Sequence, residues 1–281
     1  MKRRLAAAAL TLTAGLAAAC GALSRDAPAT ATPSASATLT MAAPSPTPFP
    51  TFTPTPQVGV GRAIVVGGDL RVRSAPNTQS EELQTLQDLQ PVVLAEAVRG
   101  ENWLVGSQTW VTTAPDWTTT WFRLEDGTYV YAGFVFILQP GEESPLSDPR
   151  GEEKWIDVDV GAQTVTAMIG DRPVYQAGVS TGSTQFPSPL GAHQVERRVA
   201  VERMTASQAG YTPQQATYDV ERVLFTQYYD LNGNALHLNY WRPQAVFGRT
   251  ATSHGCVGMQ LHDAQYFWLF ADEGTRVEIH G

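Results

Sequence analysis

The stretch LHLNYWRPQAVFGRTATSHGCVG, residues 236–258, decides how this chain is interpreted. It ends in Ser-His-Gly-Cys, residues 253–256, whose cysteine is one of only two in the sequence. The other, Cys20, closes an export-type signal, so we expect Cys256 to be the one free thiol of the mature protein. A lone thiol in an exported protein favours reactivity over a disulfide. The stretch therefore predicts a cysteine nucleophile.

Cys256 needs a partner to act as a nucleophile, since a thiol at its usual pKa is only a small fraction thiolate near neutral pH. His237 is the candidate base because an imidazole titrates near neutrality and can hold and return the proton. Gly255 lets the backbone approach a substrate closely, and the amides from His254 to Cys256 are candidate donors to an oxyanion. Three alternatives stay open: an inert buried Cys256, a structural His237, and His254 as the base.

A zinc site is the competing chemistry for the same residues. Its possible ligands are His237, His254, Cys256 and His262. His254 and Cys256 are only two positions apart, and neither a Cys-x-x-Cys nor a His-Glu-x-x-His pair accompanies them. We therefore predict no metal and no cofactor. The histidines expected to have no chemical role are His193, His262 and His280.

Residues 1–19 have the pattern of a signal peptide. Three basic residues at positions 2–4 precede an apolar run of about 15 residues, which is too short to span a bilayer comfortably. The run ends in small residues, and the string Leu-Ala-Ala-Ala-Cys that closes on Cys20 resembles a bacterial lipobox. The resemblance implies cleavage before Cys20, lipidation of its thiol, and a membrane anchor facing the cell wall. An ordinary signal peptide cut nearby is the alternative, and both place the protein outside the cytoplasm.

Residues 20–57 are predicted to be a disordered linker. From residue 27 to residue 61 no charged side chain occurs, and Pro, Thr, Ser and Ala dominate. Such a segment buries too little apolar surface to offset its ordering entropy. The whole chain has a formal charge of -8 and no basic run after residue 4, which argues against nucleic-acid binding.

Residues 58–138 are predicted to be a small β domain. Leu70 and Val72 alternate with arginines, and residues 91–98 are strongly β-forming. Three phrases in this segment resemble bacterial SH3-like domains, at residues 70–77, 100–105 and 133–135. The resemblance implies a small β-barrel, of a kind that often binds cell-wall peptide or glycan.

Four tryptophans in this first domain admit two interpretations. They are Trp103, Trp110, Trp117 and Trp121. We expect them to pack in the core or in an insertion, which is the commoner fate of so large a ring. The alternative is that exposed rings stack on sugar or wall peptide, because they offer much contact area at low entropic cost.

The chain after residue 138 divides into a linker, residues 139–152, and a second domain, residues 153–281. The linker is rich in Pro, Gly, Glu and Ser, as domain boundaries often are. Four elements are expected in the second domain: a strand over 156–160, a hairpin over 165–179, a helix over 263–272 and a strand over 275–279. The described pattern predicts a mostly β fold with one short helix.

The motifs of residues 153–280 resemble the L,D-transpeptidase (YkuD-type) catalytic domain. The family's signature, a histidine followed after a gap by Ser/Thr-His-Gly-Cys, is matched here by His237 and residues 253–256. Further matches lie at Gly178–Gly182, Ser188–Ala192 and Gly274–Ile279. The resemblance implies a β-sandwich in which Cys256 is the nucleophile and His237 the proton donor and acceptor. It assigns supporting or oxyanion-binding roles to Ser253, His254 and Gly255.

The resemblance also implies a reaction on peptidoglycan. The Cys256 thiolate attacks a tetrapeptide stem, D-alanine leaves, and the amine of a second stem resolves the thioester to give a 3→3 cross-link. Water as the acceptor makes the same site an L,D-carboxypeptidase. A non-catalytic, wall-binding lipoprotein is the third possibility.

Two positions depart from the family's pattern. Gly258 stands where most members carry Asn or Arg, which weakens the expectation of substrate carboxylate binding, and Arg249 is a candidate substitute. Leu238 follows the base where a small polar residue is usual. If a backbone carbonyl orients His237, then Leu238 costs little.

Overall fold

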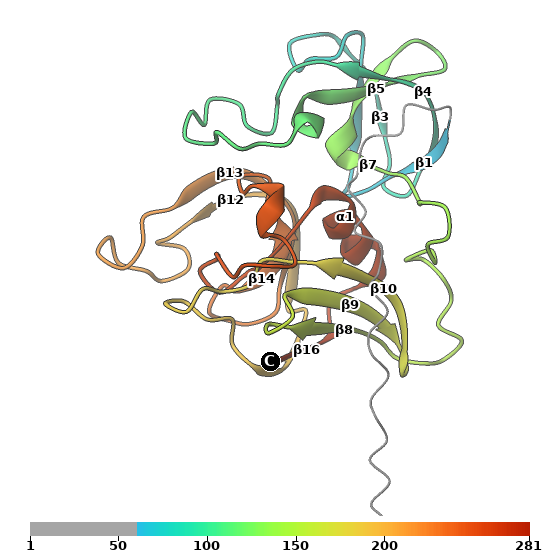
Figure 1. Ribbon diagram of the computed structural model, residues 1–281. Coiled ribbons are helices and arrows are strands. Elements are labelled where there is room, and N and C mark those ends of the chain that lie inside the picture. The colour runs from blue at the N-terminus through green and yellow to red at the C-terminus, as the bar shows by residue number, and fades with distance from the viewer. Residues whose placement is uncertain (1–60) are drawn as a thin grey trace, which may run out of the picture. The chain divides into compact units, whose positions relative to one another are not determined.

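A computed structural model describes residues 61–281 of the chain (Figure 1). The predicted signal peptide (1–19), the lipidation of Cys20 and the linker (20–57) lie outside the described residues and stay predictions. Within residues 61–281 the one α-helix is α1 (Leu261–Phe270), and strands make up most of the regular structure. The prediction of a mostly β fold with one short helix is confirmed.

The first seven strands form one sheet. They are β1 (Gly61–Val65), β2 (Leu70–Arg73), β3 (Glu82–Leu86), β4 (Pro91–Arg99), β5 (Thr120–Leu124), β6 (Tyr129–Tyr131) and β7 (Val135–Phe136). Their spatial order is β3-β2-β6-β5-β4-β1-β7, and every pairing is antiparallel. This ladder leaves β3 and β7 at its edges, so the described strands show no closed barrel. The SH3-like assignment therefore stays a prediction.

Side-chain alternation gives this sheet a core of its own. Leu70 and Val72 on β2 are buried, whereas Arg71 between them is exposed. Val92 and Leu94 on β4 and Phe122 on β5 join the same apolar cluster. Because successive side chains of a strand point to opposite faces, the period-two pattern of β2 was readable from the sequence.

Two further sheets follow in residues 153–281. The five-stranded sheet contains β8 (Lys154–Asp159), β9 (Thr164–Ile169), β10 (Arg172–Gly178), β11 (Gly191–Gln194) and β16 (Arg276–His280), in the order β10-β9-β8-β16-β11. Figure 1 shows β8, β9 and β10 side by side. The strand predicted over 156–160, the hairpin over 165–179 and the final strand over 275–279 are confirmed as β8, β9 with β10, and β16.

The four-stranded sheet carries the residues of chemical interest. Its strands are β12 (Arg197–Thr205), β13 (Asp219–Tyr228), β14 (Ala235–Leu238) and β15 (Val257–Met259), in that order. β14 and β15 run parallel, with His237 opposite Gly258. This register places the C-terminal end of the 253–256 segment beside β14, the strand that contains His237.

Helix α1 begins two residues before the predicted 263–272 and ends two residues before its predicted end. Ala264 and Phe267 are fully buried, as the helical spacing predicted, and Phe267 belongs to one apolar cluster with Phe225 of β13. The chain is already extended at Ala271, so the helix ends before the predicted stop at Gly274, which lies in the following turn with φ +89°. Among residues 61–281, no helix has the length and hydropathy needed to cross a bilayer.

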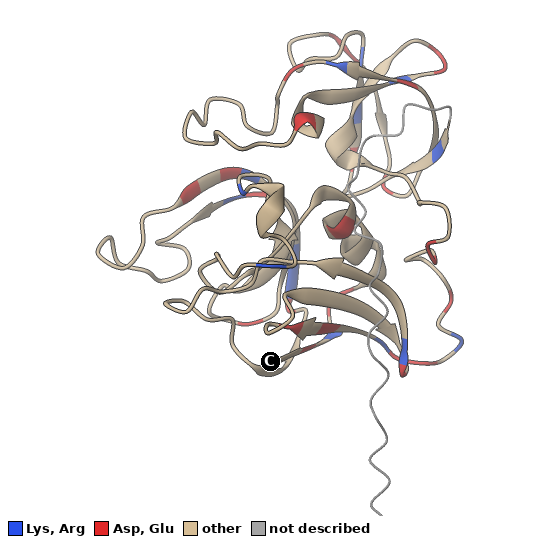
Figure 2. Cartoon of the chain, viewed as in Figure 1, with Lys and Arg blue, Asp and Glu red and all other residues tan. Residues whose placement is uncertain are grey.

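The same apolar cluster continues into the first domain. Leu104 and Trp121 of the first domain are members of it together with Phe225 and Phe267 of the second. Figure 2 shows basic and acidic residues scattered over the strands and loops of both. The core that supports β13 and β14 is therefore built by both halves of the described chain.

Candidate active site

A cavity of about 430 Å³ brings together the cysteine and the histidine that the sequence singled out. Its wall contains His237 from β14 and Ser253, His254 and Cys256 from the segment before β15. Trp110, Thr112 and Thr113 join it from the long loop between β4 and the 3-10 turn η1 (Asp116–Thr119). The cavity thus joins a loop of the first domain to residues of the second that lie far from it in the sequence.

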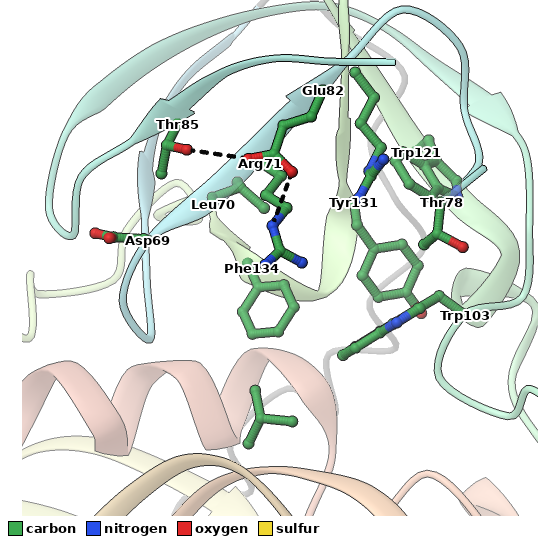
Figure 3. Close-up of a pocket in the computed structure, with 12 residues that line it drawn as sticks. Asp69, Leu70, Arg71, Thr78, Glu82, Thr85, Trp103, Trp121, Tyr131 and Phe134 are labelled. Atoms are coloured by element: carbon green, nitrogen blue, oxygen red, sulfur yellow. Dashed lines mark hydrogen bonds and ion pairs between the residues drawn. The ribbon is translucent and has the colours of Figure 1, made fainter. Parts of the chain in front are cut away.

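A second cavity, of about 370 Å³, lies mostly on the first sheet (Figure 3). Trp103, Tyr131 and Phe134 line it, and Arg71 pairs with Glu82 at 3.0 Å beside them. None of its lining residues is a cysteine or a histidine. The cavity around Cys256 is therefore the candidate active site.

His237 is held as an oriented, neutral imidazole. Its side chain is 3% exposed, and its Nδ1 lies 2.8 Å from the carbonyl oxygen of Leu238, to which Nδ1–H donates. This bond leaves Nε2 without a proton and free to accept one. Burial lowers the pKa of His237 to about 4, because the protonated ring is poorly solvated there. The Trp241 ring stacks on the imidazole, 5.6 Å between centroids, and fixes its plane.

Leu238 stands where the family usually has a small polar residue, but its backbone carbonyl is the group that orients His237. The Leu238 side chain is fully buried in the core, and its backbone carries out the orientation of His237. The leucine therefore removes nothing that the histidine needs.

Cys256 is a protonated thiol in the resting site. Burial raises its pKa to about 11, and the partner within reach of Sγ is the Gly233 carbonyl at 3.8 Å, a weak contact. A neutral imidazole and a neutral thiol can share the cavity without a charge on either. The proton then moves only when a substrate is present to receive the sulfur.

The 253–256 turn depends on Gly255. Its φ of +116° lies in a region that residues with a Cβ rarely adopt. A Cβ at this position would also collide with the Asn234 side-chain oxygen. The Gly255 carbonyl accepts two hydrogen bonds, from Ser188 Oγ at 2.7 Å and from the Tyr229 hydroxyl at 2.9 Å.

Those two bonds also set the direction of the Cys256 amide. A peptide unit is planar and trans, so its N–H points opposite to its carbonyl. Fixing the Gly255 carbonyl on Ser188 and Tyr229 therefore fixes the Cys256 N–H. That N–H has no acceptor among the described residues. It is the candidate oxyanion donor, whereas the Gly255 N–H is already bonded to Ser253 Oγ at 3.2 Å.

Ser253 and His254 hold the turn in shape. The Ser253 hydroxyl donates to the Cys256 carbonyl at 2.5 Å. The His254 carbonyl accepts the Tyr211 hydroxyl at 2.9 Å, and its ring packs on Phe186 and Tyr218 with centroids 4.5 and 5.0 Å away. Burial and the nearby Arg242 lower the pKa of His254, so it is neutral at neutral pH.

Several residues of this site were not found from the sequence. They are Ser188 and Tyr229 below Gly255, Tyr211 and Phe186 around His254, and Asn239, Trp241 and Arg242 in the cavity wall. The Ser-Pro-Leu-Gly motif did carry a signal for Ser188. The arginine that lines the cavity is Arg242, so the suggestion of Arg249 as a substitute for a polar residue at 258 is wrong.

The loop between β4 and η1 is fastened to the second domain by hydrogen bonds. Gln108 donates to the Tyr240 hydroxyl at 2.8 Å and accepts the Glu221 amide at 2.9 Å. Thr113 Oγ1 donates to the Trp241 carbonyl at 3.0 Å. These bonds hold the intervening Trp110, 50% exposed, in the cavity wall.

The four tryptophans do not share one role. Trp117 and Trp121 are buried, and Trp103 is partly buried against the core, which confirms core packing for these three. Trp110 departs from that expectation because it is half exposed and faces the cavity that contains Cys256. Binding of the cell wall by the first domain stays a prediction.

The remaining histidines lie outside the cavity. His262 bonds Glu142 at 2.9 Å and stacks on Phe136, His280 pairs with Asp157 at 3.1 Å, and His193 contacts the Pro189 carbonyl at 3.0 Å. The zinc set considered above would need His262 beside Cys256, and His262 does not line that cavity. Residues 61–281 contain no group of three or more His, Cys, Asp or Glu side chains that could hold a metal ion.

The segment that builds this site matches a family model. Residues 153–279 match the model of the L,D-transpeptidase catalytic domain, YkuD. The match ends just short of the C-terminus and includes both β14 and the 253–256 turn. No curated protein matches the sequence.

Solved structures of L,D-transpeptidases resemble the chain at low identity. The structure of LD transpeptidase LdtMt1 in complex with imipenem is 15% identical, covering 57% of this chain and 66% of its own, with a TM-score of 0.44. L,D-transpeptidase 3 from Mycobacterium tuberculosis is 19% identical over 47% of this chain and 62% of its own, with a TM-score of 0.43. An L,D-transpeptidase from Mycobacterium smegmatis is 15% identical over 81% and 96%, with a TM-score of 0.41. The chain covers less than two thirds of the first two structures.

The neutral thiol predicts how Cys256 reacts with iodoacetamide. Because the pKa of Cys256 is raised to about 11, its thiolate fraction grows about tenfold for each pH unit between 7 and 10, and the alkylation rate should rise in step. Mass spectrometry of the Cys256 peptide follows the rate, and the denatured protein, whose thiol titrates near about 8.5, is the control. A rate that stays constant from pH 5 to 9 would contradict the prediction, since it indicates a preformed thiolate–imidazolium pair.

Proposed function

We propose that this protein is a peptidoglycan L,D-transpeptidase with Cys256 as its nucleophile and His237 as its proton carrier. The observation that carries the proposal is the shared cavity: a thiol and an oriented neutral imidazole meet there, inside a segment that matches the L,D-transpeptidase catalytic domain. The export signal and lipobox predicted from residues 1–20 support the proposal, since they predict a site outside the cytoplasm, where the stem peptides are.

Acylation begins when His237 Nε2 takes the Cys256 thiol proton as Sγ attacks the carbonyl carbon of the third residue of a tetrapeptide stem. The carbonyl oxygen becomes an oxyanion, and the Cys256 N–H is in place to bind it. The bond to D-alanine then breaks, and the departing amine takes the proton from His237. A thioester remains on Cys256, and the imidazole is neutral again.

Deacylation reverses these roles. The amine of a second stem attacks the thioester carbonyl and gives up a proton to Nε2. The carbon–sulfur bond breaks, Sγ regains that proton, and a 3→3 cross-link is released. If water attacks instead, the product is a trimmed stem, as in an L,D-carboxypeptidase.

The wall of the cavity suits a peptide with a charged end. Arg242 is the one arginine that lines it, and its guanidinium donates to the Thr252 carbonyl at 3.2 Å while leaving other N–H groups for a carboxylate. Trp110 and Trp241 add apolar surface for the side chains and backbone of a stem.

The test incubates wild-type protein and Cys256→Ala with purified tetrapeptide muropeptides and reads the masses of the products. We expect cross-linked dimers and released D-alanine from the wild type and neither from the variant. We also expect a carbapenem to add its mass to the peptide that contains Cys256. Trimmed monomers alone would assign the carboxypeptidase reaction, and a wild type with no product and no adduct would refute both.

A further inference from the structure

Asn239 is a buried polar side chain in the wall of the candidate active site. It is 4% exposed and lines the cavity together with His237 and Cys256. Its Oδ1 is one of the few buried side-chain atoms of residues 61–281 that have no hydrogen-bond partner. Burying an amide oxygen without a partner is unfavourable, because the bond it made to water is lost and none replaces it.

The backbone fixes where this amide points. Asn239 is two residues after His237, and residues two apart in an extended chain face the same side. Its N–H donates to the Met259 carbonyl at 2.9 Å, which continues the pairing of β14 with β15 by one residue. The side chain therefore lies just past the end of β14, on the same side as the His237 imidazole.

Gly258 makes room for it. A Cβ built on Gly258 would lie 2.7 Å from Asn239 Nδ2, closer than Cβ atoms approach other atoms in proteins, and 3.0 Å from Asn239 Cβ, which is tighter than most such contacts. Gly258 cannot shift away, because its N–H and carbonyl are both bonded to Ser180, at 2.9 and 3.0 Å. A side chain at 258 and the present position of Asn239 exclude one another. Gly258 therefore does more than remove a polar side chain from position 258. The space that its missing side chain leaves is occupied by the polar side chain of Asn239.

We propose that Asn239 is a substrate-binding residue, whose side-chain amide pairs with a peptide group of the stem next to the bond that is cut. A side-chain amide offers one acceptor and two donors, which match the N–H and carbonyl of a peptide bond. The inference rests on the proposed function for the identity of the peptide. Asn239 supplies, from the residue after β14, a polar group next to the place that a side chain at 258 would occupy.

The test measures binding without turnover. In a Cys256→Ala background, a muropeptide with a tetrapeptide stem is titrated by calorimetry into chains carrying Asn239 or Asn239→Leu. We expect the leucine, which is similar in volume, to weaken binding about tenfold or more, as the loss of a paired amide predicts. We expect the melting temperature to stay equal or rise, because an unpartnered buried oxygen is removed. A purely structural asparagine would lower it.

Thr226→Val is the matched control. Thr226 is also fully buried with an unpartnered hydroxyl, on β13, but it does not line the cavity. The valine should leave binding unchanged.

A second variant keeps the proposal testable if Asn239→Leu unfolds. Gly258→Asn alone should bind poorly because its side chain meets Asn239. Asn239→Gly with Gly258→Asn removes both atoms that crowd position 258, moves the amide across to β15 and should recover much of the lost affinity. Recovery supports the proposal, and failure to recover overturns it.

Three results separate this inference from the proposed function. Binding within about twofold of the parent in Asn239→Leu overturns the inference, and so does a parent that does not bind the muropeptide. Binding that depends on Asn239, in a protein whose intact Cys256 forms no product, refutes the transpeptidase and leaves the inference standing.

Discussion

Replacing His237 with alanine is expected to lower kcat for cross-linking by about 10²–10⁴-fold, the usual contribution of a positioned general base. The thiol of Cys256 has a pKa near 11, so at pH 7 almost none of it is thiolate without a proton acceptor. The carbonyl of Leu238 fixes the tautomer of His237, and Trp241 fixes its plane. The variant loses the acceptor but keeps the cavity wall, so KM should change much less than kcat.

The pH dependence of kcat/KM gives a second test of His237 as the base. A histidine whose pKa is lowered to about 4 stays neutral, and able to accept a proton, down to that pH. The acid limb of kcat/KM should therefore lie near pH 4 in the wild type and not near the usual imidazole value of about 6.5. The limb should disappear in His237→Ala, which has no imidazole to protonate.

His280→Asn is the control for this experiment. His280 is exposed, pairs with Asp157 at the far end of β16, and lies outside the cavity. Its replacement should leave kcat, KM and the acid limb where they are. Equal losses in the two variants, or a His237→Ala protein with near-normal kcat, would remove His237 from the mechanism.

The candidate catalytic pair, Cys256 and His237, could be located from the sequence because its signal is local. Cys256 lies in a four-residue motif, and His237 stands on a strand whose short apolar pattern is visible in Leu-His-Leu. The hydrogen-bond partner of His237 is the carbonyl of the next residue, so it too depends on local backbone geometry alone. The strands β8, β9, β10 and β16 could be predicted for the same reason, because strand periodicity is also a local property of the sequence.

The rest of the site could not be predicted because it depends on contacts between distant segments. Trp110 reaches the cavity only because Gln108 and Thr113 bond to the second domain, and no periodicity encodes such a contact. Gly258 looks like a lost polar side chain until the register of β14 on β15 sets Asn239 against it. A residue's effect there depends on its neighbour across the sheet as much as on its own type.

Gly255→Ala is expected to reduce both activity and stability, because two separate obstacles meet at one Cβ. The backbone is at φ +116°, where a residue with a Cβ is strained by about 1–3 kcal/mol. The new methyl group would also collide with the Asn234 side-chain oxygen. Asn234 cannot easily turn away, since its side-chain amide donates to Asp230 at 2.6 Å and its backbone N–H to the same carboxylate at 2.9 Å.

The 253–256 turn must therefore move, and its movement displaces Sγ and the N–H of Cys256, the two groups to which the proposed mechanism assigns the attack and the oxyanion. We expect kcat to fall by about 10²-fold or more, the size of effect seen when one oxyanion donor is lost. Gly141→Ala separates the two obstacles, because Gly141 has φ +89° and open space around its Cβ. It should lower the melting temperature through backbone strain alone and leave kcat unchanged. If Gly255→Ala behaves like Gly141→Ala, the contact with Asn234 does not hold the turn, and the direction of the Cys256 amide is set elsewhere.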